Sequence, residues 1–219
     1  MLTCSLSCSF LDLAGAVDTV IEAIQICLPL SRIELLDELQ MQAINEYKKT
    51  SHEEKPTLFI EIQGTPLGVR EQIEKFEEIA KDHNLINFHW SDRQEEIDSL
   101  WSARHGALYA ALNLAPGKKA ITTDVCVPIS SLTKCILDTK KDLESSSIIA
   151  PIVGHVGDGN FHLILLLDPE NQDEVKEAKG INERLIKRAL EMKGTCTGEH
   201  GIGLGKKEYL RIEKGVSSV

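Results

Sequence analysis

Two histidines frame a short glycine-rich turn in the second half of the chain. His155 and His162 stand at the ends of the string HVGDGNFH, in which residues 157–160 separate two apolar runs. Apolar, β-branched runs on either side of a Gly/Asp/Asn cluster predict a β-hairpin. A hairpin centred on Asp158 and Gly159 would place the two histidines directly opposite each other, with Cβ atoms roughly 4.5–5.5 Å apart. Two imidazoles at that separation can bind one metal ion.

A second glycine-rich stretch, residues 194–209, supplies the side chains that such a pair lacks. Glu199 offers a carboxylate ligand, and His200 beside it offers an imidazole that can take up a proton. Three protein ligands with one open position are typical of a catalytic divalent site, so His155, His162 and Glu199 are the predicted metal ligands. A structural role for the two hairpin histidines is the alternative that their spacing leaves open.

Two further features of the glycine-rich stretches have simpler explanations than ligand binding. Asp158 stands between two glycines and is predicted to form the turn rather than to bind the metal. The string Gly201-x-Gly203-x-Gly205-Lys206 lacks the third glycine of a dinucleotide fingerprint and the Ser/Thr of a phosphate-binding P-loop. We therefore expect a loop at a helix start, where backbone N–H groups can meet an anion.

A helix predicted over residues 95–112 carries Arg104 one turn after Trp101. A solvated arginine is the simpler interpretation, and a guanidinium held by the aromatic ring and directed at a carboxylate is the alternative. Lys118 and Lys119 precede a predicted strand, where an exposed turn explains them equally well. Taken alone, these residue types favour a solvated arginine.

The composition is that of an ordinary globular protein with an acidic surface. Of the 219 residues, 42% are hydrophobic and 26% are charged, and the net charge is −10. The sequence has no Lys/Arg stripe with interleaved aromatic residues, which argues against nucleic acid as a partner. No apolar run approaches the length of a membrane span, and the N-terminal residues resemble neither a secretory signal nor a transit peptide. The six cysteines form no CxxC pair, which predicts reduced thiols in an intracellular compartment.

Short strands alternate with helices along the chain. Strands are expected over residues 2–10, 31–36, 57–63, 87–90, 120–127, 148–153 and 161–167. Helices are expected over residues 13–28, 37–48, 67–82, 95–112, 132–143, 171–192 and 204–213. Because the strands are short and one adjacent pair is a hairpin, we predict an α+β fold. Its sheet should be mainly antiparallel, with helices packed on one face.

Four strings are more specific than a fold alone requires. They are HVGDGNFH (155–162), TCTGEHGIGLGK (195–206), TTDVCVP (122–128) and LWSARHGALYAAL (100–112). Together they resemble the C-terminal substrate domain of the FAD-linked D-2-hydroxy-acid dehydrogenases. Within that family the resemblance is strongest to the cytochrome-linked D-lactate dehydrogenases of mitochondria.

The resemblance implies a flavin oxidoreductase. Such an enzyme oxidises D-lactate and related D-2-hydroxy acids to 2-oxo acids such as pyruvate, reduces FAD, and passes electrons to cytochrome c. It implies a mitochondrial location, although the chain shows no targeting peptide.

The resemblance also assigns roles to single residues. It implies a divalent ion, Zn or Mn, on three ligands: His155, His162 and Glu199. The family's substrate-hydroxyl base corresponds to His200, and its carboxylate-binding arginine corresponds to Arg104. A lysine contact corresponds less securely to Lys119 or Lys118.

The chain departs from the family pattern at both ends. The resemblance covers residues 14–214, so we expect residues 1–13 to be a short non-homologous lead and the FAD-binding N-terminal domain to be absent. Residues 215–219 replace the family's closing segment, which suggests a truncated isoform. We therefore expect that this chain alone does not turn over. The alternative function is a non-catalytic metal-binding or interaction fragment.

Overall fold

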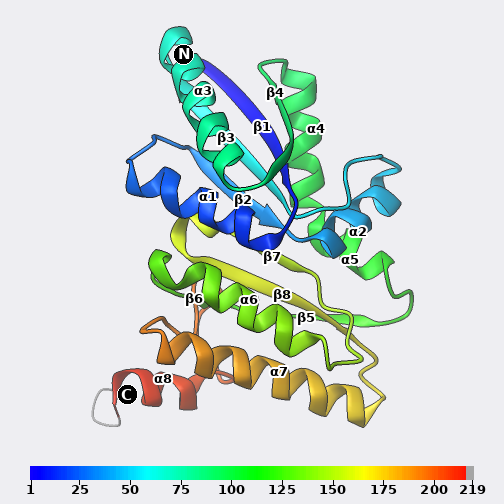
Figure 1. Cartoon of the computed structure of the whole chain (residues 1–219). Coiled ribbons are helices and arrows are strands. Elements are labelled where there is room, and N and C mark those ends of the chain that lie inside the picture. Colours follow the sequence, from blue (N-terminus) through cyan, green and yellow to red (C-terminus); the bar gives the residue numbers. More distant parts are fainter. Residues whose placement is uncertain (216–219) are drawn as a thin grey trace.

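The computed structural model describes residues 1–215 and is built around one eight-stranded sheet (Figure 1). The strand order is β4-β1-β3-β2-β7-β8-β5, and the short strand β6 also pairs with β8. All the strand pairs described are antiparallel. The predicted α+β class with an antiparallel sheet is confirmed.

The first half of the chain forms two β-α-β units joined by a helix. Its elements are β1 (Leu2–Phe10), α1 (Leu13–Gln25), β2 (Arg32–Leu36), α2 (Glu38–Lys48), β3 (Thr57–Gly64), α3 (Pro66–Asp82) and β4 (Leu85–Ser91). The side chains of Asp12, Asp37 and Thr65 accept backbone N–H groups at the starts of α1, α2 and α3. These caps fix where each helix begins, because the first turn has no N–H partners of its own.

The second half adds helices and the other strands. They are α4 (Gln94–His105), α5 (Ala107–Asn113), β5 (Lys119–Thr122), β6 (Val125–Cys126), α6 (Leu132–Leu143), β7 (Ile152–Gly154), β8 (Asn160–Leu167), α7 (Gln172–Glu191) and α8 (Lys207–Lys214). The predicted helix over residues 95–112 is divided at Gly106, where ψ is 2° instead of a helical value. The predicted strand over residues 120–127 is likewise divided into β5 and β6.

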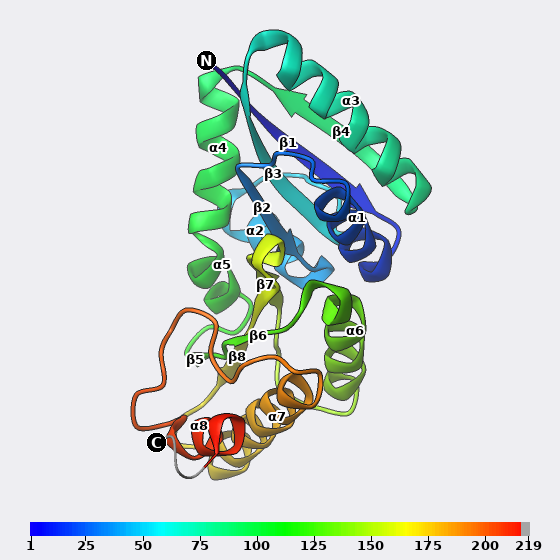
Figure 2. The same ribbon diagram turned by 90° about the vertical axis from the view of Figure 1, so that its left-hand side faces the viewer.

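Helices cover both faces of the sheet, whereas the sequence predicts one covered face. Figure 2 shows α4 and α5 on one side and α1 and α6 on the other. On β2 and β3, Leu35 and Leu58 belong to the larger core cluster, under α1 and α3. Leu36 and Phe59 point the other way and pack with α2 and α4. Strands that are apolar on both faces must be covered on both, which is the physical reason for the difference.

The hairpin has a different register from the predicted one. β7 and β8 pair Val153 with His162, so His162 does not face His155 directly. A 3-10 turn, Val156–Asp158, occupies the connection, and Gly159 closes it with a φ of +76°. The register differs by two residues, and an even shift preserves the face on which each side chain lies. The turn role predicted for Asp158 agrees with its place in this connection.

β1 lies inside the sheet rather than ahead of the domain. It pairs with β3 on one side and with β4 on the other. The domain boundary predicted at residue 13 therefore does not coincide with a structural boundary. Of the predicted divergent tail, residues 216–219 lie outside the described residues.

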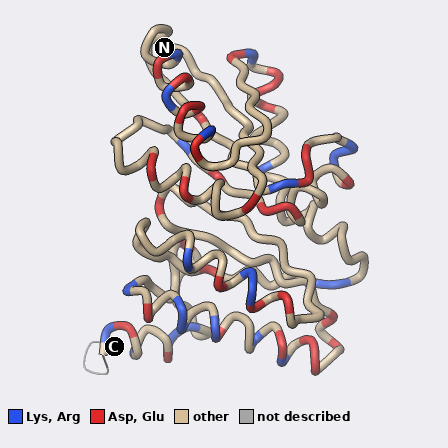
Figure 3. The backbone as a smooth tube through the Cα atoms, in the orientation of Figure 1, with Lys and Arg blue, Asp and Glu red and all other residues tan. Residues whose placement is uncertain are grey.

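Charged residues of both signs are interspersed along the helices, as Figure 3 shows. Within residues 1–215, none of the helices combines the length and the apolar character that crossing a bilayer requires.

Candidate metal centre

His162 lies on β8, and a neighbouring carbonyl holds its ring. The residue is 3% exposed, and Nδ1 lies 2.8 Å from the carbonyl oxygen of Thr123. Because a carbonyl oxygen can only accept, Nδ1 donates and Nε2 is left as an acceptor. This carbonyl is available because the Thr123 hydroxyl, rather than the carbonyl, accepts the N–H of Leu163. Burial lowers the pKa of His162, which favours the neutral imidazole that metal binding needs.

His155 follows the last residue of β7 and lies beside Glu34 of β2. Its Nδ1 is 2.6 Å from Glu34 Oε1, and this hydrogen bond raises the pKa of His155. The rings of His155 and His162 meet edge to face, with centroids 5.8 Å apart. The structure thus brings the two predicted ligands together, because diagonal neighbours on one sheet face are still within reach of long side chains.

Glu199 reaches into the space between the imidazoles. Its Oε1 lies 3.1 Å from His162 Nε2, 3.3 Å from His155 Nε2 and 3.6 Å from His200 Nε2. Two ligand atoms about 2.1 Å from a tetrahedral ion are separated by roughly 3.4 Å. The three predicted ligands therefore lie at separations that a small divalent ion would impose.

The environment of the His162 Nε2 atom shows whether these residues fit a metal ion. Glu199 Oε1 lies near this nitrogen but outside hydrogen-bonding geometry, so the buried nitrogen has no hydrogen-bond partner within residues 1–215. A buried polar atom without a partner is costly, and a metal ion would satisfy it. The ligand atoms of His155, His162 and Glu199 all lie within 4.8 Å of one another. These donors fit Zn or Mn.

Asp124 organises the loop that carries Glu199. The residue is 1% exposed and accepts the backbone N–H groups of Gly198, Glu199 and His200. It also accepts the hydroxyl of Thr197 at 2.6 Å. Burial alone would raise the pKa of Asp124, but these hydrogen bonds hold it well below the usual range. The anion at the glycine-rich loop is thus a side chain of the protein, bound by the backbone N–H groups of residues 198–200, and Lys206 lies 3.6 Å from its Oδ2.

A second trio, Asp124, His162 and His200, is also close enough to hold an ion. The Asp124 carboxylate is already occupied by the donors of the loop, and an additional donor comes from the Asn160 amide at 2.8 Å. Nδ1 of His162 is occupied by Thr123. The unoccupied Nε2 of His162 faces Glu199 instead, so the trio with His155 and Glu199 fits an ion better.

His200 and Arg104 flank the predicted metal ligands. The His200 ring stacks on His162, with centroids 4.9 Å apart and an interplanar angle of 8°, and is partly exposed. Arg104 lies on α4, and its Nε and Nη2 atoms are 3.1 and 3.0 Å from Glu34 Oε2. Arg104 is therefore an ion-paired arginine, contrary to the solvated one that its residue type alone favours.

The structure places Trp101 and the two lysines away from Arg104 and the cluster. Trp101 does not hold Arg104; its ring lies under Arg32, with the guanidinium carbon 4.9 Å from the ring centroid. Lys119 begins β5 opposite Leu167, five residues along β8 from His162, so the structure does not bring Lys119 to the cluster. Lys118 is paired with Glu174 at 2.8 Å.

Sequence reasoning missed Glu34 and Asp124. Each is a single acidic residue in or beside a short apolar strand, and both are buried. The sequence offers one indication of them. A carboxylate is rarely buried without a hydrogen-bond or ion-pair partner, so an acidic residue inside an apolar strand indicates such a partner. Nothing in the local pattern identifies which distant residue that partner is.

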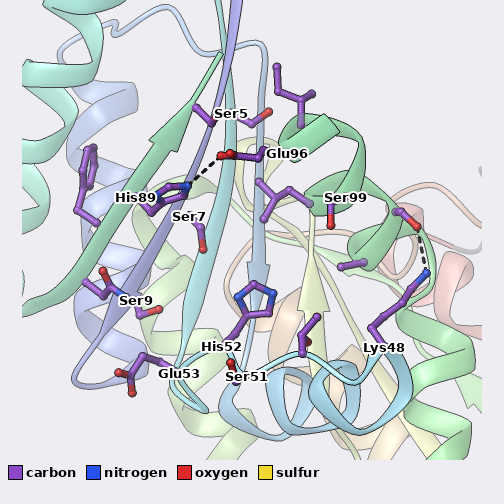
Figure 4. A pocket seen from close by; sticks show the side chains of 18 residues that line it. Ser5, Ser7, Ser9, Lys48, Ser51, His52, Glu53, His89, Glu96 and Ser99 are labelled. Atoms are coloured by element: carbon purple, nitrogen blue, oxygen red, sulfur yellow. Dashed lines mark hydrogen bonds and ion pairs between the residues drawn. The ribbon is translucent and has the colours of Figure 1, made fainter. Parts of the chain in front are cut away.

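A separate cavity lies on the sheet face that carries Glu34, against α4. Figure 4 shows its floor of β1 serines, below a wall from α4. Its volume is about 680 Å³, and the polar residues shown include Ser5, Ser7, Ser9, Lys48, His52, His89, Glu96 and Ser99. Among the described residues that line it, none belongs to the proposed metal cluster.

Comparison with known proteins defines the family. The profile described as "FAD linked oxidases, C-terminal domain" matches residues 2–219. The chain therefore belongs to this family of C-terminal domains.

Two relatives are informative. A probable mitochondrial D-lactate dehydrogenase of Danio rerio is 49% identical over 208 residues, which is 95% of this chain and 42% of that protein. The mitochondrial D-lactate dehydrogenase [cytochrome] of Arabidopsis thaliana is 41% identical over 212 residues, covering 97% of this chain and 37% of that protein. The chain thus spans about two fifths of the length of these relatives.

The fold also occurs in solved structures. A 4-ethylphenol oxidase from Gulosibacter chungangensis superposes with a TM-score of 0.62 over 99% of this chain and 51% of the oxidase. The sequence identity is 15%, so this likeness concerns the fold alone.

Proposed function

We propose that this chain is the substrate- and metal-binding part of an FAD-dependent D-2-hydroxy-acid dehydrogenase that oxidises D-lactate to pyruvate. The observation that carries the proposal is the convergence of His155, His162 and Glu199 on one point, beside His200. The family membership and the names of the relatives support the reaction class. The chemistry of the side chains supports the individual roles.

Arg104 is proposed to bind the substrate carboxylate. Glu34 contacts its Nε and Nη2, whereas Nη1 has no hydrogen-bond or ion-pair partner within residues 1–215. A guanidinium fixed on one edge can offer the other edge to a carboxylate. This anchor orients the α-carbon and its hydroxyl relative to the histidines.

His200 is proposed as the base that takes the hydroxyl proton on its Nε2 atom. A neutral imidazole is suited to proton transfer near neutral pH, and its partial exposure leaves room for a substrate. A divalent ion, when bound by His155, His162 and Glu199, supplies a Lewis acid that stabilises negative charge beside them. FAD, held by the rest of a longer protein, would supply the acceptor for the hydride of the α-carbon.

The flavin partner is proposed to come from the rest of a longer protein. All the family-matched residues of this chain belong to the C-terminal domain, so we propose that the 219-residue chain alone binds metal without turnover. The second candidate function is a non-catalytic metal-binding or interaction fragment, and it rests on the same match to the C-terminal domain alone. By analogy with the names of the relatives, we propose a mitochondrial location and cytochrome c as the electron acceptor.

Metal and flavin content of the purified chain test the proposal. We expect about one Zn or Mn per chain, no flavin absorbance, and loss of the metal in the double variant His155→Ala/His162→Ala. The matched control, His83→Ala/His89→Ala, removes two histidines away from the cluster and should keep the metal. Metal absent from the wild-type chain would contradict the proposed site. FAD bound one-to-one would contradict the proposal that the flavin partner lies outside this chain.

A further inference from the structure

We propose that Glu34 is a positioning residue that holds the metal ligand His155 and the substrate anchor Arg104 in one arrangement. The inference rests on the metal site of the proposed function and goes beyond it, because Glu34 belongs to neither the ligand set nor the substrate contacts. It follows from the sheet register, from the contacts of the two carboxylate oxygens, and from the burial of the side chain.

The sheet register makes Glu34 and His155 neighbours. β2 pairs with β7 through Leu35 opposite Gly154 and Leu36 opposite Val153. Continuing this antiparallel ladder by one residue places Glu34 opposite His155. The side chains of directly opposed residues lie on the same face of the sheet. β7 ends at Gly154, so His155 is the first residue beyond the paired strands, and a side-chain hydrogen bond to Glu34 joins the two residues there.

Each carboxylate oxygen of Glu34 has its own partner. Oε1 lies 2.6 Å from His155 Nδ1, and Oε2 lies 3.1 Å from Arg104 Nε and 3.0 Å from Arg104 Nη2. The residue is 8% exposed, so the positive charge of Arg104 offsets the cost of burying the carboxylate. Removing the carboxylate would therefore release both partners at once.

The contact with His155 determines which ring nitrogen faces the metal. A carboxylate accepts a hydrogen bond, so Nδ1 of His155 donates and the lone pair of Nε2 points to the cluster. A carboxylate behind a ligating histidine fixes the tautomer and the ring orientation in this way. Glu34 therefore presents His155 to the ion in the one tautomer that can bind it.

Glu34→Gln is the decisive variant because glutamine has one acceptor oxygen for two donors. If that oxygen accepts from Arg104, whose charged hydrogen bond is stronger, the glutamine N–H group faces His155 Nδ1. The ring would then carry its proton on Nε2 and could not bind metal in that tautomer. We expect Zn affinity to fall by about 10- to 100-fold, measured by competition with a chelator.

Glu61→Gln is the matched control. Glu61 is a glutamate of the neighbouring strand β3, is 4% exposed, and is also paired with an arginine, Arg32 at 3.5 Å. It contacts none of the proposed metal ligands. This control should lose a comparable amount of stability and keep its Zn affinity, which separates positioning from a general loss of fold.

A spectroscopic signature completes the test. ¹⁵N chemical shifts of His155 in the metal-free chain should report a protonated Nδ1 in the wild type and in Glu61→Gln, and a protonated Nε2 in Glu34→Gln. Equal Zn affinity of Glu34→Gln and wild type would overturn the positioning role while leaving the metal site intact. A wild-type chain that binds no Zn would overturn both the site and the role of Glu34. A Glu34→Gln variant that binds Zn weakly but keeps the wild-type tautomer would overturn the proposal that Glu34 acts by fixing the tautomer of His155.

Discussion

The backbone N–H of Glu199 donates to the buried carboxylate of Asp124, with 3.3 and 3.1 Å to its two oxygens. The same carboxylate accepts the N–H of His200 at 3.0 Å. The proposed third metal ligand and the proposed base are therefore held by one acidic residue about 75 positions earlier in the chain.

The first prediction concerns this carboxylate. Asp124→Asn places an amide N–H group among the N–H donors of residues 198–200, so the loop should leave its position. We expect a loss of about 3 kcal/mol in the free energy of unfolding, measured with urea, together with weaker Zn binding. Asp158→Asn, at an exposed acidic residue of the hairpin turn, should change stability by less than about 0.5 kcal/mol. Zn binding unaffected by Asp124→Asn would contradict the organising role of Asp124.

The second prediction concerns the space at Gly198. A Cβ atom there would overlap the amide of Asn160 and lie 2.9 Å from Asp124 Oδ1. Gly198→Ala should therefore push the loop away from Asp124 and reduce Zn affinity by about 10-fold or more. Gly205→Ala is the control in the same loop, because nothing lies within 4 Å of its Cβ position. Titration with Zn measures both variants, and equal affinities would rule out the steric argument.

The third prediction is a pH dependence from Glu213 on α8. Burial alone would raise its pKa, but hydrogen bonds from the Cys196 N–H, the Thr195 hydroxyl and Lys214 lower it from 4.5 to about 2. A lowered folded-state pKa means that the stabilisation is present above pH 4.5 and is lost as the pH falls toward 2. The upper limit is about 3.5 kcal/mol, since one pKa unit corresponds to about 1.4 kcal/mol.

Glu213→Gln tests this dependence. The wild type should be more stable than the variant at pH 6, and the difference should shrink as urea unfolding is repeated at pH 4 and pH 3. A difference that is independent of pH would show that the Glu213 charge does not stabilise the loop at residues 195 and 196.

The fourth prediction concerns metal removal. Zn at a concentration of 100 times its Kd should raise the free energy of unfolding by about 2.7 kcal/mol, and EDTA should reverse the effect. His162→Ala should abolish this stabilisation because it removes a buried ligand. His89→Ala, at an exposed histidine of β4, should retain it. Stabilisation by Zn that persists in His162→Ala would place the ion elsewhere.

Local sequence patterns determine much of the fold. The helices predicted from residues 13 and 37 begin at Leu13 and Glu38, and the helix over residues 132–143 has the predicted bounds. The glycine-rich strings contain all three proposed metal ligands, and the structure brings these residues together. Those signals act over a few residues, which is the range over which propensity and capping are informative.

Other features of the site depend on strand pairing between distant segments. Glu34 meets His155 because β2 pairs with β7, and no local pattern encodes that pairing. The hairpin register could not be predicted. The connection contains a 3-10 turn at residues 156–158, so it is two residues longer than the tight turn that the sequence suggests. The Trp101 ring packs against Arg32 of β2, a residue 69 positions earlier, which no local pattern indicates.

The same pairings have a consequence for folding kinetics. The Glu34–His155 contact joins residues 121 positions apart, and the Asp124–His200 contact joins residues 76 positions apart. Contacts between such distant residues form only after long loops have closed, which is slow in antiparallel sheets. A metal ion added to the refolding chain would therefore meet His155 and His162 in the local β7–β8 hairpin first. The complete proposed ligand set, with Glu199, would form only after Asp124 holds the distant loop, so the rate of tight binding would follow that later step.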